Sequence, residues 1–278
     1  MIKAGICSVT LAKHSVEEVL ETVVRAGLQG IEWGGNGHVP HGDVECARRV
    51  RNLTEEAGLS VSSYGSYYKA GVSEADGLSF QSVLDSAVAL GAPTIRVWAG
   101  DRNTADAETT FIQSVVDDTI RIAERAADHG ISITFEFHGG SLTDCNETAV
   151  LFADRVRHPN VFFSWQPPHG YTLEQGLEGL KGLLPRLSTV HMYHWTIGSY
   201  EKNMLNETVR PLVYPDDFYR HPLEDGEDRI LAYCETIQTT GRDHFMLLEF
   251  VKNDSMEQLL VDGKRLSSLL RKSTPQLV

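Results

Sequence analysis

The order of apolar and polar residues divides the chain into short β-rich runs that alternate with amphipathic helices. After a first run at residues 4–9, a capping box predicts a helix, because Ser15 is followed three residues later by Glu18. The apolar positions of this helix form one face, at Val16, Val19, Leu20, Val23 and Val24. Gly27 then stands where helices commonly end, ahead of the next apolar run at residues 30–33.

The unit of helix, glycine and strand repeats along the chain. The strands it predicts are 4–9, 30–33, 59–64, 94–98, 131–137, 161–166, 188–193 and 245–250. Most are continuously apolar rather than alternating, which is typical of parallel strands buried on both faces. Eight units in 278 residues predict an α/β fold, a single (β/α)₈ TIM barrel over residues 1–278, rather than an open sheet. No linker or change in composition marks a second domain.

The spacing between strands is widest before the last one. The excess lies in the segment from Trp195 to Asp225, ahead of a helix that carries Ile230, Leu231, Cys234 and Ile237. In a barrel this segment follows the seventh strand, and such loops lie on the active-site face. We therefore expect an extended loop after strand seven that acts as a lid or a binding loop.

Composition and charge narrow the class of protein. Apolar residues make up 41% of the chain and charged residues 23%, as in a soluble globular enzyme. The formal net charge of −13, without a run of basic residues, argues against a nucleic-acid partner. The cysteines form no CxxC pair, so we expect free thiols at Cys7, Cys46, Cys145 and Cys234. Without a signal-peptide pattern or a membrane-length apolar run, we expect a cytoplasmic protein with no membrane partner; its oligomeric state, homo-oligomer included, stays open.

Two glutamates give the strongest chemical signal. Glu136 and Glu249 each stand in a strongly apolar strand, in the sequences Thr-Phe-Glu-Phe and Leu-Leu-Glu-Phe. An unpaired ionised carboxylate there would cost several kcal/mol, so each needs a metal ion or an Arg or Lys. With His191 between them in chain order, we favour a metal site over a structural salt bridge. Carboxylate, imidazole and amide donors suit Mn²⁺, Mg²⁺, Co²⁺ or Zn²⁺.

The order of these residues along strands five to eight resembles that of a known family. Glu136, Gln166-Pro167-Pro168-His169, His191 and Glu249 are similar to the motifs of the sugar phosphate isomerase/epimerase family. This family belongs to the xylose isomerase-like barrel superfamily, which includes the ketose 3-epimerases. The resemblance covers the whole chain in architecture, but its specific motifs are four short patches.

The resemblance implies which residues form the site. One divalent metal ion, manganese among the candidates, would be held by Glu136, Gln166, His191 and Glu249. The family motif has Asp where this chain has Gln166, so the site carries one negative charge fewer. That leaves a retuned metal site, a weakly occupied one, or a non-catalytic relative. The residues expected to bind substrate are Trp98, His138, His169, His194 and Arg220, the last from an Arg-x-Pro segment.

The implied function is an isomerase or epimerase of a sugar or sugar phosphate, a small-molecule substrate of carbohydrate metabolism. The metal would stabilise an ene-diolate, while Glu136 and Glu249 remove and return the proton on opposite faces. One alternative is a dehydratase of a cyclic polyol or a dehydroshikimate-like acid, with Arg96 and Arg220 as candidates for binding a carboxylate. Another is a ligand-binding relative without catalysis. The superfamily also has an apurinic endonuclease branch, which needs further histidines on strands three and four. This chain has Tyr64 and Trp98 there, which argues against an endonuclease.

Overall fold

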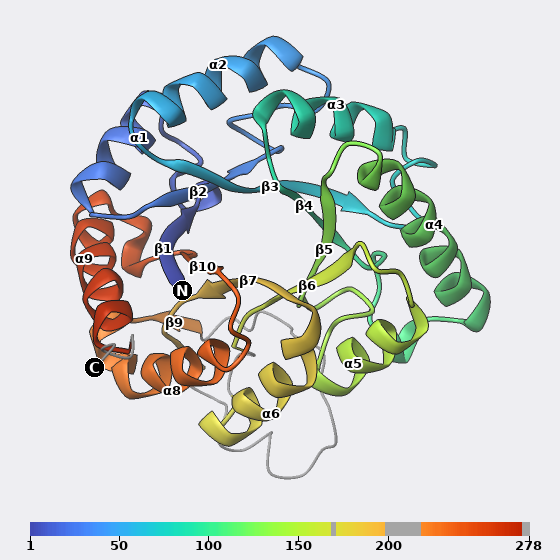
Figure 1. Cartoon of the computed structure of the whole chain (residues 1–278). Helices are drawn as coiled ribbons and strands as arrows, with labels where there is room; N and C mark the ends of the chain where they lie inside the picture. Colours follow the sequence, from blue (N-terminus) through green and yellow to red (C-terminus); the bar gives the residue numbers. More distant parts are fainter. Residues whose placement is uncertain (168–170, 198–217, 274–278) are drawn as a thin grey trace.

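The computed structural model describes residues 1–167, 171–197 and 218–273. Eight parallel strands close into a barrel in the order β1-β10-β7-β6-β5-β4-β3-β2, so the predicted TIM barrel is confirmed (Figure 1). The strands are β1 Ile2–Cys7, β2 Gly30–Gly34, β3 Ser60–Lys69, β4 Thr94–Trp98, β5 Ser132–Glu136, β6 Val161–Trp165, β7 Leu187–Met192 and β10 His244–Leu248.

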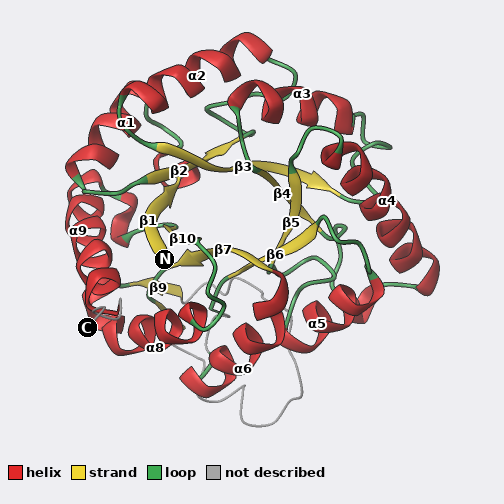
Figure 2. Cartoon of the chain, in the orientation of Figure 1, coloured by secondary structure: helices red, strands yellow, loops and turns green. Residues whose placement is uncertain are grey.

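The helices form a ring around the outside of the barrel (Figure 2). They are α1 Val16–Arg25, α2 Val44–Glu56, α3 Phe80–Leu90, α4 Thr109–Ala127, α5 Asn146–Arg155, α6 Leu173–Leu183, α8 Glu227–Gln238 and α9 Met256–Ser273. The capping box predicted for α1 is present, since Ser15 Oγ accepts from Glu18 N and Ser15 N donates to the Glu18 carboxylate. Among the described helices, none has the length and apolar character needed to cross a membrane.

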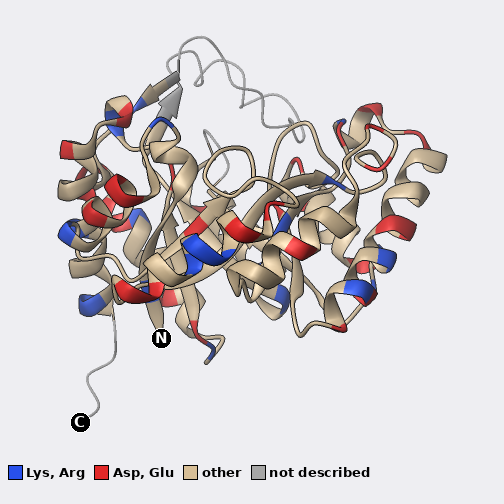
Figure 3. Cartoon of the chain, turned by 90° about the horizontal axis from the view of Figure 1, so that it is seen from above, with Lys and Arg blue, Asp and Glu red and all other residues tan. Residues whose placement is uncertain are grey.

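Acidic and basic residues are interspersed along the outer helices (Figure 3). All four cysteines are free thiols, as predicted from their spacing. The distribution of charged residues in Figure 3 indicates that the excess of acidic over basic residues lies mainly on the outer surface. The carboxylates inside the barrel form a separate, small group.

Alternation along the strands decides which side chains enter the barrel. Phe135 of β5 packs on Phe152 of α5 with ring centroids 5.1 Å apart, so its side chain points outward. Successive residues of a strand point to opposite faces, and Glu136 therefore points inward. At the end of β6, Trp165 packs on Tyr233 of α8 in the same way, so the following Gln166 is also directed into the barrel.

Strand β3 differs from the prediction, because it continues to Lys69 instead of ending at Tyr64. Its register against β4 moves from Gly65↔Arg96 to Tyr68↔Val97, which leaves two residues of β3 unpaired. Tyr67 is one of them and has a φ of +56°, an uncommon value for a bulky side chain. A bulge of this kind re-aims a side chain, and local patterning does not reveal it.

The segment between β7 and α8 is long, as expected, and residues 198–217 of it lie outside the described residues. Its two ends pair as antiparallel strands, β8 Trp195–Ile197 and β9 Phe218–Arg220, which the sequence pattern did not predict. A 3₁₀ turn at Leu223–Gly226 then leads into α8. The start of the predicted loop is thus joined to its end beside the barrel mouth.

Candidate active site

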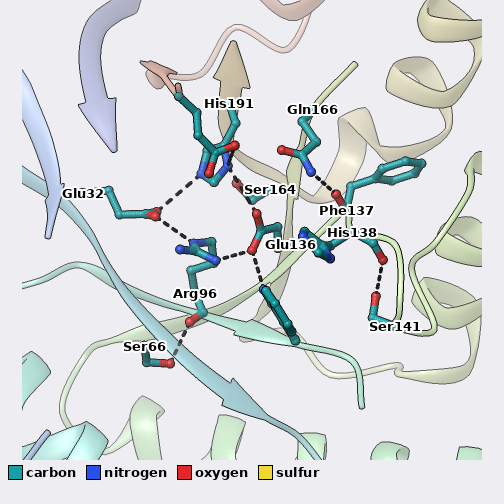
Figure 4. A network of polar contacts seen from close by, with 12 residues as sticks. Glu32, Ser66, Arg96, Glu136, Phe137, His138, Ser141, Ser164, Gln166 and His191 are labelled. Atoms are coloured by element: carbon teal, nitrogen blue, oxygen red, sulfur yellow. Dashed lines mark hydrogen bonds and ion pairs between the residues drawn. The ribbon is translucent and has the colours of Figure 1, made fainter. Parts of the chain in front are cut away.

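Five buried charged or titratable side chains meet at the carboxyl ends of the strands. They come from β2, β4, β5, β7 and the residue after β10, and they are Glu32, Arg96, Glu136, His191 and Glu249. Their exposed fractions lie between 1% and 7%. Figure 4 shows Arg96 between Glu32 and Glu136, with His191 above them. Barrel closure thus brings together residues that are far apart in the chain.

Arg96 links two of the carboxylates. Its Nε lies 2.7 Å from Glu32 Oε1, and its second arm forms an ion pair with Glu136 Oε2. The same Glu136 oxygen accepts a hydrogen bond of 2.5 Å from Trp98 Nε1. A salt bridge, weighed above as the alternative to a metal, is therefore present, but it occupies only one oxygen of Glu136. The other oxygen faces His191 at 3.6 Å.

These contacts lower the pKa values of two carboxyl groups. Burial alone would raise the pKa of Glu32, but Arg96, His191 and Ser63 together lower it to about 2. Burial is likewise outweighed at Glu136, where chiefly Arg96 holds the pKa far below its usual range. Three formal negative charges against one guanidinium leave −2 (−3 + 1) when His191 is neutral. A buried excess of this sign favours a divalent cation.

His191 lies at the centre of the cluster, with neither ring nitrogen hydrogen-bonded within the described part of the chain. Nδ1 lies 3.4 Å from Glu249 Oε2 and 3.6 Å from Glu136 Oε1, while Nε2 lies 3.6 Å from Glu32 Oε2. Burial opposes a charge on the ring, but its close neighbours, Cys7 first and then the carboxylates of Glu249 and Glu32, raise its pKa well above the usual value. The ring therefore takes up a proton readily when nothing else neutralises its neighbours.

The predicted metal ligands fit a divalent ion. One donor atom each from Glu136, His191 and Glu249 lies within 4.8 Å of the others. Gln166 is 2% exposed, and its Nε2 donates 2.5 Å to Phe137 O. A carbonyl cannot donate, so this bond fixes the amide orientation and leaves Gln166 Oε1 buried without a described partner. In Figure 4 that oxygen is turned towards the side of His191.

A second donor group adjoins the first. It consists of Cys7, Glu32 and His191, so His191 belongs to both groups. Burial raises the pKa of Cys7 well above its usual value, so the side chain is a neutral thiol. Both oxygens of Glu32 already accept hydrogen bonds, Oε1 from Arg96 Nε and Oε2 from Ser63 Oγ at 2.6 Å. This group is therefore less suited to a cation than Glu136, His191 and Glu249.

The predicted substrate contacts fall into two places. Trp98 and His138 lie at the cluster, stacked with ring centroids 4.4 Å apart and an interplanar angle of 19°. His194 and Arg220 lie instead by the small β8–β9 sheet, and His169 is outside the described residues. The role of each in substrate binding stays a prediction.

The two residues by the small sheet have their own partners. Arg220 pairs with Asp254 and lies over the Trp195 ring, 5.2 Å from its centroid. His194 packs against Gly226, where a Cβ would lie 2.6 Å from its Nδ1, so glycine makes room for the ring. Burial, and secondly His221, lowers the pKa of His194. Both residues therefore help to attach the segment after β7 to the barrel.

Two features of the site were missed or underweighted from the sequence. Arg96 was considered only as a partner for a substrate carboxylate, although an arginine inside Thr-Ile-Arg-Val-Trp is as unusual as a glutamate in an apolar strand. Tyr67 stands in the same tyrosine-rich stretch as Tyr64 and Tyr68, a pattern that predicts an aromatic rim around a pocket. The hydroxyls of the latter two donate to Val39 O and Asp118 instead, and both rings are fully buried. The Tyr67 ring covers the Arg96 guanidinium at 4.7 Å.

Comparison with known proteins places this geometry in a family. A family model described as "Xylose isomerase-like TIM barrel" matches residues 20–266. The chain belongs to this family. A curated relative, the 3-dehydroshikimate dehydratase of Bacillus anthracis, is 23% identical over 96% of this chain and 97% of its own length.

Solved structures share the fold over almost the whole chain. A probable 3-DHS dehydratase of Bacillus anthracis has a TM-score of 0.74 at 19% identity, over 96% of this chain and 99% of that one. A Mycobacterium smegmatis family member in complex with magnesium has 0.69 at 13%, over 98% and 97%. A Methylomonas D-allulose 3-epimerase has 0.64 at 14%, over 98% of each chain. At these identities the likeness shows the fold alone.

Proposed function

We propose that this protein is a divalent-metal-dependent enzyme that removes a proton from a carbon next to a carbonyl. One observation carries the proposal. A buried cluster, with a formal charge of −2 when His191 is neutral, presents an oxygen of Glu136, Nδ1 of His191, an oxygen of Glu249 and the amide oxygen of Gln166. In His191 and Gln166 these atoms have no hydrogen-bond partner among the described residues. Metal-containing relatives support the same interpretation.

A divalent cation held there would supply Lewis-acid polarisation of a substrate carbonyl. The two glutamates would then have different roles. Arg96 and Trp98 hold Glu136 as a carboxylate and lower its basicity, so it serves as an anchored ligand. Glu249 has His191 as its only ion-pair partner among the residues described, so it is the better placed group to accept a proton.

This asymmetry favours dehydration over epimerisation. An epimerase needs one group to remove the proton and a second, on the opposite face, to return it, whereas Glu136 is tied up by Arg96. A dehydratase needs one base, and a hydroxyl on the carbon next to the new anion leaves as water, taking up the proton that the base has removed. The curated relative, a 3-dehydroshikimate dehydratase, supports a cyclic polyol or dehydroshikimate-like substrate. Sugar epimerisation is the second candidate, because Glu136 and Glu249 flank His191.

The test combines metal analysis with turnover. We expect about one divalent metal per chain, and loss of activity when a chelator removes it. Glu249→Gln should lower kcat by about 10²- to 10⁴-fold because it removes the base. Glu257→Gln, on the exposed face of α9, is the matched control and should retain full activity.

The substrates to screen are 3-dehydroshikimate, inososes and ketoses, each with solvent deuterium to detect proton removal. A dehydratase product gains ultraviolet absorbance, whereas an epimerised sugar does not. Full activity in Glu249→Gln, or purified protein that takes up no metal, would contradict the proposal.

A further inference from the structure

The proposed ligand set uses one nitrogen of His191 and leaves the other unexplained. An imidazole that binds a metal ion through Nδ1 carries a proton on Nε2, and that N–H needs an acceptor. His191 is 1% exposed, so bulk water does not supply one. The acceptor must therefore come from the side chains that pack on the far side of the ring.

Glu32 occupies that side. Its Oε2 lies 3.6 Å from His191 Nε2 (Figure 4). The other ring nitrogen, Nδ1, faces Glu136 and Glu249. We propose that Glu32 is a positioning residue. In the metal-bound protein it would close the gap to the His191 ring, accept its Nε2–H and so direct the Nδ1 lone pair towards Glu136 and Glu249. This role rests on the proposed function, because it concerns the same metal site.

Glu32 is itself rigidly placed. Ser63 Oγ donates to Oε2 at 2.6 Å, and Arg96 Nε donates to Oε1 at 2.7 Å. The other arm of Arg96 holds Glu136, so one guanidinium sets the distance between the carboxylates on either side of the imidazole. A metal-bound histidine whose second nitrogen meets a fixed carboxylate has a defined tautomer and ring orientation.

The backbone leaves space for this arrangement at Gly65 of β3. A Cβ there would lie 2.7 Å from the Arg96 guanidinium and 2.9 Å from Glu32 Oε1. Any larger residue would therefore push the ion pair away from its present position. The φ of Gly65 lies outside the left-handed region, so backbone conformation does not require a glycine here. The close approach of the Arg96–Glu32 ion pair does.

Cys7 is a competing neighbour of the His191 ring. Its sulfur belongs to the group with Glu32 and His191. A neutral thiol is a weak acceptor, whereas an ionised carboxylate is a strong one, so Glu32 is the better partner for the N–H. If Cys7, Glu32 and His191 instead formed a second cation site, the protein would bind two metal ions per chain, and removal of the thiol would abolish one of them.

The experiment follows metal binding and the histidine tautomer in the full-length protein. Metal-free protein is titrated with Co²⁺, and ¹⁵N-histidine NMR of the Zn²⁺-loaded protein reports which nitrogen of each bound ring carries the proton. In the wild type we expect one metal ion per chain, held by a ring that is protonated at Nε2. Glu32→Gln should weaken Co²⁺ binding by about 10- to 100-fold and speed exchange of this N–H with solvent.

Two further variants separate positioning from folding. Ser63→Ala keeps the Arg96 pair and removes only the hydroxyl that holds Oε2, so we expect Co²⁺ binding about three- to fivefold weaker. Cys7→Ala should leave Co²⁺ affinity within about threefold, and circular dichroism checks that each variant is folded.

The outcomes are distinct. Wild-type protein that binds no metal overturns the proposed function. Wild-type protein that binds metal through Nε2, or two ions of which one is lost in Cys7→Ala, overturns only the role of Glu32. Folded Glu32→Gln protein with unchanged affinity and N–H exchange, or unchanged values in Ser63→Ala should Glu32→Gln not fold, overturns it as well.

Discussion

The two glutamates of the barrel mouth have opposite surroundings. Glu136, at the end of β5, is held by Arg96 and Trp98. Glu249, after β10, has a single described ion-pair partner, His191 at 3.4 Å. We call the group of Glu32, Arg96 and Glu136 the interlocked half of the site, and it would hold the ligands in a fixed geometry. The half around Glu249 would keep polar atoms available for chemistry. Under the proposed function, the same residue type would therefore have two roles that differ because of its neighbours.

The largest effect should come from breaking the interlocked half. Arg96→Leu leaves Glu32 and Glu136 as buried carboxylates without their cation. We expect a loss of about 3–5 kcal/mol in the free energy of unfolding, measured by urea denaturation of metal-free protein. Arg49→Leu is the control, because it removes an exposed pair with Glu17 that is worth at most about 1 kcal/mol. Equal losses in both variants would show that the Arg96 pairs add nothing.

The second-largest effect should come from acid, which protonates Glu32 and so weakens the ion pair of the interlocked half. The pKa of Glu32 falls from 4.5 to about 2 on folding, so its pairing stabilises the protein above pH 4.5 and is lost as the pH falls towards 2. The contribution is on the order of 3 kcal/mol. Urea midpoints between pH 6 and 2 should fall less steeply in Glu32→Gln than in the wild type. Parallel curves for the two proteins would contradict this account.

Metal binding should couple the two halves through a proton. The raised pKa of His191 means that the ring is protonated in the metal-free protein, and a metal ion must displace that proton. Apparent affinity should therefore rise by up to about tenfold per pH unit below that pKa. Calorimetry in buffers of different ionisation enthalpy should show about one proton released. An affinity independent of pH would mean that His191 is not a ligand.

The smallest effect on stability should come from the less constrained half. In metal-free protein, Glu249→Gln should change the free energy of unfolding by less than about 1 kcal/mol, because no arginine or tryptophan among the described residues pairs with Glu249. Glu136→Gln, its matched counterpart, deprives Arg96 of a partner and should cost several kcal/mol. Similar losses in the two variants would remove the distinction between the glutamates.

Local patterns were sufficient for much of the fold. The capping box at Ser15 and the apolar face of α1 depend only on neighbouring residues, and both are present as predicted. Polar groups within apolar strands also drew attention to Glu136 and Glu249. The bulge that turns Tyr67 over Arg96, and the pairing of β8 with β9, could not be predicted, because they depend on register and on contacts between distant segments.

The eight strand–helix units can be read from the sequence alone, and so can the order in which carboxylate, amide and imidazole groups follow their strands. These features depend on the period of apolar residues and on the buried cost of a charge, both of which can be read locally. Two contacts become visible only in the folded barrel: Arg96 joins Glu32 to Glu136, and His191 stands between Glu32 and Glu249. The reason is that barrel closure and strand register, which no short stretch of sequence contains, determine which buried charges become neighbours.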